Sequence, residues 1–187
     1  NDAETVYLAL WSLAFQDIGR IQLEDVDHLL THPHASHRRV AAFLGASFKR
    51  AVTHKRLIPL LADQDWRVVE EAVDAFQEPA SEPVRAAGLF DALNALLARM
   101  PKSLPEPKPL VWPWEQYVLN PDLVLRALLA NRAERSPTFG LRHLSKLSPD
   151  GRQLVAEELG KVAPQDAEGR LALARLLGDT SPDVRST

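Results

Sequence analysis

The stretch PHASHRRVAAFLGASF, residues 33–48, contains the pattern that decides the fold. From residue 35 onward, apolar side chains recur every three or four residues, so that Val40, Leu44 and Phe48 share one face of a helix. We therefore predict a helix over residues 35–50 that buries one side.

The same spacing continues on both sides of this stretch, and proline or small polar residues separate the apolar segments. Strand signals are nearly absent, because no alternating β-branched run and no Asn-Gly or Asp-Gly hairpin turn occurs. The chain is therefore predicted to be all-α. The other predicted helices cover 4–18, 22–31, 57–61, 63–76, 81–97, 114–119, 121–134, 137–147, 150–162 and 166–178.

One segment interrupts the helical pattern. Residues 101–113 contain five prolines, which favour extended backbone. We predict helical hairpins over 1–100, a proline-rich loop or linker over 101–113, and further hairpins of the same array over 114–187. The last hairpin is expected to be incomplete, because SPDVR at 181–185 has the form of a helix start and only two residues follow it. We therefore expect the chain to be part of a larger protein.

Composition restricts the function classes. The 187 residues are 45% hydrophobic, carry a net charge of −3 and include no cysteine, so disorder, disulfides and thiolate chemistry are excluded. No apolar run is long enough for a membrane helix, and the N-terminus lacks the features of a signal peptide. We predict a cytoplasmic location and no membrane association.

Three segments share a local form in which a polar or proline turn leads into valine, then small and large apolar residues. They are PHASHRRVAAFLGASF from Pro33, DQDWRVVEEAVDAF from Asp63 and SEPVRAAGLFDAL from Ser81, and DTSPDVRS from Asp179 shows the same opening. This form resembles the second helix of HEAT repeats. The resemblance implies a right-handed α-solenoid of stacked antiparallel hairpins with a partner along its helical surface. An irregular helical bundle is the alternative, because the step from Val68 to Val84 is too short for a complete pair.

A basic block lies between acidic flanks. Residues 28–67 carry seven basic and two acidic residues. The basic residues are candidates for partner binding, because cations that neutralise phosphates or carboxylates dominate such affinity. The other interpretation is that they pair with acids on the next repeat. These residues are Arg38, Arg39, Lys49, Arg50, Lys55, Arg56 and Arg67.

Four histidines form a second cluster at positions 28, 32, 34 and 37. His28 and His32 have the spacing that zinc helices use. Pro33 breaks that helix, however, so we interpret the cluster as a polar turn and predict neither a metal nor a cofactor. Glu70-Glu71 and Glu157-Glu158 are adjacent acids that point in different directions on a helix, and we expect them to be surface charge.

Tryptophans supply the aromatic candidates. Trp112 and Trp114 lie in the proline-rich stretch, where they form either a buried plug or an exposed anchor for a partner. Trp66 opens a helix and is expected between repeats or on a groove.

Enzyme motifs are absent: the chain has no glycine-rich phosphate loop, zinc-protease helix or serine elbow. We predict a non-catalytic protein–protein interaction scaffold. The alternative is a nucleic-acid-binding module that uses the basic 38–67 segment. One version of it resembles the HEAT-like DNA glycosylases through Asp65, Trp66 and Arg67, although Glu70 stands where that family has an aspartate four residues after the tryptophan.

Overall fold

The described part of the computed structural model contains helices and no strands, which confirms the all-α prediction. The structure describes residues 5, 8–9, 11–12, 23–48, 51–102, 119–133, 137–162 and 167–186. Among the helices in these ranges, none combines the length and the hydropathy that crossing a bilayer requires.

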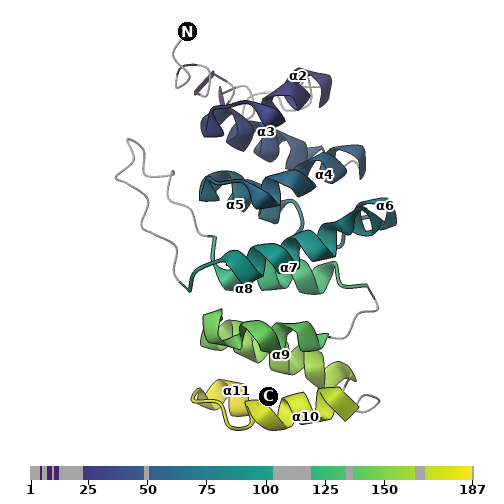
Figure 1. Ribbon diagram of the computed structural model, residues 1–187, viewed down its shortest axis with the longest axis vertical. Helices are drawn as coiled ribbons and strands as arrows, with labels where there is room; N and C mark the ends of the chain where they lie inside the picture. Colours follow the sequence, from purple (N-terminus) through teal and green to yellow (C-terminus); the bar gives the residue numbers. More distant parts are fainter. Residues whose placement is uncertain are drawn as a thin grey trace.

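The described helices follow one another as pairs along the longest axis of the molecule (Figure 1). Each pair has a first segment and a second helix. The pairs are α2 (Leu23–Asp27) and η2 (His28–Thr31) with α3 (Ala35–Ser47); α4 (Ala51–Leu57) and η3 (Ile58–Ala62) with α5 (Trp66–Asp74); α6 (Glu82–Val84), η4 (Arg85–Leu89) and α7 (Phe90–Arg99) with α8 (Pro121–Ala130); η6 (Pro137–Lys146) with α9 (Pro149–Val162); and α10 (Ala167–Leu176) with α11 (Pro182–Ser186).

The second helices of successive pairs contact one another in chain order: α3 with α5, α5 with α8, α8 with α9, and α9 with α11. The first segments also meet their neighbours, since α4 contacts α6, η3 contacts α7 and η6 contacts α10. One hydrophobic cluster runs through these contacts. Burying a leucine or valine side chain contributes about 1.5–3 kcal/mol, so each pair is stabilised chiefly by the pair beside it. The second helices supply Val40, Leu44, Val68, Ala72, Val124, Leu128, Val155 and Leu159, all at most 1% exposed.

In each of the five described pairs, a cation binds backbone carbonyl groups at or just after the end of the first segment. These carbonyls lie in the last turn of a first segment or in the four residues after it, where backbone acceptors have no donor within the helix. The donors are Arg38 to His32 and Pro33, Arg99 to Leu61 and Asp63, Lys146 to Leu97, Ala98 and Met100, Arg152 to Leu147, and Arg185 to Asp179 and Thr180.

Side chains also tie neighbouring turns together. The Arg38 guanidinium donates to both carboxylate oxygens of Asp63, at 2.6 and 2.9 Å, and Arg152 makes the same fork with Asp179 at 2.8 and 3.1 Å. Such two-point hydrogen bonds fix orientation as well as distance. Each tie links one pair to the following one.

The tie between α8 and α9 uses a serine and depends on a glycine. Asp122 accepts the backbone N–H of Ser148 at 3.1 Å and the Ser148 hydroxyl, while the same hydroxyl oxygen accepts the N–H of Gly151 at 3.2 Å. A Cβ on Gly151 would lie 2.2 Å from Asp122 Oδ1. The carboxylate occupies the space that any other residue at position 151 would fill.

Several predicted boundaries agree with the structure and others differ. The helix predicted over 63–76 is α5, and Asp65 caps it by accepting the Arg67 N–H. The helix predicted at 57–61 begins earlier, at Ala51, and ends as the 3₁₀ segment η3. The segment from Ser81 opens a first helix, not a second one, and the second helix of that pair is α8. The predicted loop at 101–113 and short helix at 114–119 fall mostly outside the described residues.

Candidate interaction surface

The arginines of the basic block that the structure describes are held in ion pairs. Two reach acids of the next pair, as the second interpretation of the block expected. Lys55 is exposed on α4, and Lys49 and Arg50 lie outside the described residues. The pairs are Arg38 with Asp63, Arg39 with Glu71, Arg56 with Asp27, and Arg67 with Asp65.

The Arg39–Glu71 pair is buried, and it corrects the prediction that Glu71 is surface charge. The side chains are only 9% and 13% exposed, and their atoms Nε and Oε1 are 3.0 Å apart. Burial raises the pKa of the Glu71 carboxyl; Arg39 opposes this effect, while Glu70 and Asp74 add to it. Glu158 is likewise 15% exposed and bridges Arg132 and Lys161. The prediction from adjacent positions on one helix was wrong for Glu71 and Glu158, because it could not include partners from other turns or helices.

Trp66 lies half-buried at the start of α5, beneath a cation of the following pair. The guanidinium carbon of Arg99 is 4.5 Å from the centre of its ring. This distance is within cation–π range, and burial lowers the pKa of Arg99. Trp66 therefore takes part in the junction between pairs, as one of its two predicted placements required. Trp112 and Trp114 are outside the described residues.

Asp65, the residue next to Trp66, caps the N-terminus of α5. Its carboxylate accepts the Arg67 N–H at 2.9 Å and two bonds from the Arg67 guanidinium at 3.0 and 2.7 Å. Burial opposes ionisation, but these bonds lower the pKa of Asp65. The three residues that suggested a glycosylase-like site thus form a helix cap and a junction in this structure.

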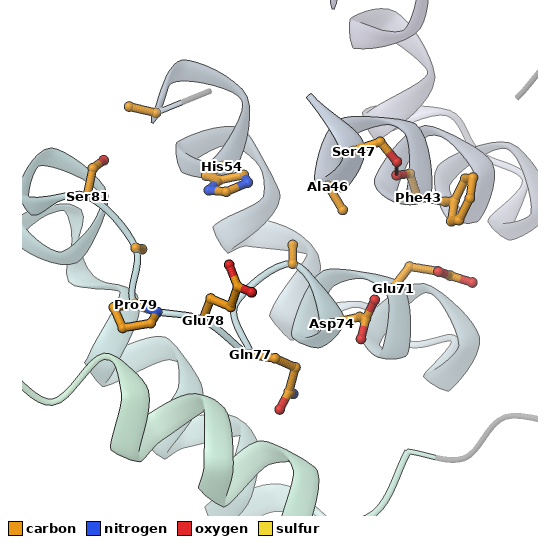
Figure 2. Close-up of a pocket in the computed structure, with 13 residues that line it drawn as sticks. Phe43, Ala46, Ser47, His54, Glu71, Asp74, Gln77, Glu78, Pro79 and Ser81 are labelled. Carbon is orange, nitrogen blue, oxygen red and sulfur yellow. Dashed lines mark hydrogen bonds between the residues drawn. The ribbon is translucent and has the colours of Figure 1, made fainter. Parts of the chain in front are cut away.

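A large hollow of the described surface lies where α3, α4 and α5 meet the loop after α5. Its volume is about 550 Å³. Figure 2 shows His54 on one side, Glu78 on the loop, and Glu71 and Asp74 on successive turns of α5. The rest of the lining is small or apolar: Phe43, Ala46, Ser47, Ala51, Ala75, Pro79, Ala80 and Ser81, with Gln77.

A second hollow of about 230 Å³ adjoins the first on the side of α8. The two hollows share Glu71, Asp74 and Gln77, and the second adds Glu70, Arg39, Val73 and two leucines, Leu119 and Leu123. We call the two together the α5 depression. It runs across three consecutive second helices.

The α5 depression carries more negative than positive charge. Four carboxylates line it, and the one arginine in its lining is paired with the buried Glu71. Asp74 and Glu78 are exposed. No motif pointed to these two residues. The only signal in the sequence was the return to acidic charge after residue 67.

Three of the four histidines, His32, His34 and His37, lie close together in the structure. The rings of His32 and His37 stack with centres 4.1 Å apart, and the ring of His34 is 5.4 and 5.9 Å from them. The cluster forms the turn before α3, in agreement with a polar turn. Among the described residues, no group of three or more histidine or acidic side chains is arranged to hold a metal ion.

No protein-family model, curated protein or solved structure matches the chain.

Proposed function

We propose that the chain is a non-catalytic scaffold of the HEAT-like α-solenoid type, and that a protein partner binds along its second helices in the α5 depression. The single observation that carries the proposal is the depression, in which two adjoining hollows of about 550 and 230 Å³ share the exposed side of α5. A surface of this size accommodates several side chains of an extended segment.

The architecture supports a scaffold. Second helices of successive pairs contact one another in a row, and in each described pair a cation binds carbonyl groups near the end of the first segment. A row of helices of this kind presents a continuous surface on which a partner lies across several units.

The chemistry of the depression favours a cationic partner segment. Carboxylates at Glu70, Asp74 and Glu78 attract lysine or arginine side chains. The walls formed by Phe43 and its small neighbours match the aliphatic part of those side chains, which prefers apolar surface while the charged end meets the acids.

The nucleic-acid alternative has weaker support. Phosphate binding needs cations that are available to the ligand, whereas Arg38, Arg39 and Arg67 each bind a carboxylate. The acids of α5 would also repel a phosphate backbone. The cytoplasmic location stays a prediction.

Binding of a short fluorescent peptide of alternating lysine and alanine, followed by anisotropy at low salt, tests the proposal. We expect saturable binding, no binding of the glutamate–alanine counterpart and none of double-stranded DNA. The double variant Asp74→Asn with Glu78→Gln should weaken binding about tenfold, which corresponds to roughly 0.7 kcal/mol for each charge removed.

A charge-matched variant is the control. Asp150→Asn with Glu157→Gln removes two exposed carboxylates from α9, outside the α5 depression. It should keep the affinity of the parent chain. Equal weakening by both double variants would mean that only net charge attracts the peptide, and the proposed site would be wrong.

A further inference from the structure

The turn before α3 is built on an imidazole acceptor. The backbone N–H of His34, the residue that precedes α3, donates to Nδ1 of His32 at 3.2 Å. His32 also stacks on the buried ring of His37. Its carbonyl oxygen holds the Arg38 guanidinium at 2.7 Å. One histidine thus contributes its ring and its backbone to the same turn.

Two later turns have the same hydrogen bond with a carboxylate as the acceptor. Asp63 Oδ1 accepts the N–H of Asp65 at 2.9 Å, and Asp179 Oδ1 accepts the N–H of Ser181 at 2.8 Å. In each turn the acceptor lies two residues before the donor. His32 therefore stands where the other two turns have an aspartate.

The two kinds of acceptor differ in their response to acid. A histidine is the side chain that gains a proton most readily under mildly acidic conditions, and the charged imidazole carries a proton on both nitrogens, whereas an ionised aspartate keeps its acceptor oxygens. The protonated ring of His32 has no lone pair for the His34 N–H. The hydrogen bond that shapes the turn is then lost.

The surroundings also disfavour a positive charge on His37. Burial lowers the pKa of His37, and the His32 and His34 imidazoles lower it further. The cluster precedes the N-terminus of α3, where the helix dipole is positive. A group with a lowered pKa stabilises the fold above its unfolded-state pKa, and that contribution is lost as the pH falls through 6.5 and below.

Charged groups on the neighbouring elements do not offset this effect. Three pairs of charges on these elements are engaged with one another, and the electrostatic influences on His37 are those of the two other imidazoles. The exposed acids of α2 are Glu24 and Asp25. The engaged pairs are Arg38 with Asp63, Arg39 with Glu71, and Arg56 with Asp27.

We infer that the turn formed by His32, His34 and His37 is a pH-sensitive joint between the first two helix pairs. Protonation of His32 removes the acceptor, opens the start of α3 and loosens the seat of Arg38, the residue that ties this turn to Asp63. This device is separate from partner binding in the α5 depression and does not depend on it.

Amide hydrogen exchange of the full chain, corrected for intrinsic rates, tests the inference. Protection of the amides of residues 35–40 should fall about tenfold between pH 7.5 and 5.5, the change expected for losing one hydrogen bond. The amides of α9 serve as the internal reference.

Two variants separate the joint from general acid sensitivity. His32→Asn and His32→Asp keep an acceptor that does not titrate in this range, so each should abolish most of the fall in protection. His28→Asn, which changes an exposed histidine of η2, should behave like the parent chain. Unchanged protection in the parent chain, or an equal fall in both His32 variants, would overturn the inference.

Discussion

Gly151 provides a sharp test of how α8 and α9 are joined. Its Cα faces the Asp122 carboxylate, and an added methyl group would lie 2.2 Å from Oδ1 and 2.7 Å from Cγ of that residue. Real Cβ atoms do not approach so closely, so Gly151→Ala must displace Asp122. The displacement breaks both hydrogen bonds between Asp122 and Ser148.

The expected cost follows from these contacts. A hydrogen bond to a charged acceptor contributes about 1.5–3 kcal/mol, and the low end applies here because Ser148 is exposed. Losing two costs about 3 kcal/mol, and alanine recovers about 1 kcal/mol because it is the better helix former. We expect Gly151→Ala to lower the free energy of unfolding by roughly 2 kcal/mol, from ~3 lost and ~1 regained.

Urea denaturation followed by circular dichroism at the helix band measures this difference. Gly160 lies on the same helix, and a methyl group added there would meet no neighbouring side chain within 4 Å. Gly160→Ala is therefore the matched control and should stabilise by up to about 1 kcal/mol. In an Asp122→Ala background, Gly151→Ala should lose most of its cost. A Gly151→Ala protein as stable as the parent chain would refute the reasoning.

Three further perturbations probe other parts of the structure. Asn131→Asp should destabilise the chain by about 3 kcal/mol in urea denaturation. The buried amide of Asn131 accepts the Ala80 N–H and donates two hydrogen bonds, and a carboxylate cannot make the two donations. An unchanged free energy of unfolding would contradict this prediction. Burial lowers the pKa of His143, and nearby cations add to the effect, so stability is lost as the pH falls below 6.5. The thermal midpoint of His143→Gln should therefore fall less between pH 7.5 and 5.5 than that of the parent chain. An identical fall in the two proteins would contradict this prediction. Arg152→Lys loses the fork with Asp179 and should raise hydrogen exchange in α11 several-fold, with unchanged exchange as the opposing outcome.

The helical class and many helix starts were predictable, because they depend on local signals. Apolar spacing marks the buried faces, and residues such as Asp65 and Asn120 satisfy free amide groups at the first turns of α5 and α8. The position of a helix within its pair was not predictable in the same way. The segment from Ser81 has the same local form as that from Pro33, yet it packs in the other row.

The candidate site was harder to predict for a related reason. The α5 depression joins residues of α3, α4, α5 and the following loop, and nothing in their spacing brings His54 next to Glu78. The basic block was visible as composition, but the acid partners of Arg38 and Arg39 lie 25 and 32 residues away along the chain. Composition reports how many charges are present, and only the fold decides which of them are neutralised.

The cations at the turns also have a consequence for how the chain is made. The carbonyl of Leu61, near the end of η3, receives its donor from Arg99, a residue synthesised 38 positions later, and Met100 receives its donor from Lys146 after another 46. On a nascent chain, these two carbonyl groups therefore lack their donors until the first segment of the next pair has been synthesised. The donors Arg38, Arg152 and Arg185 instead come from the second helix of the same pair, so those contacts can form before the next pair is synthesised.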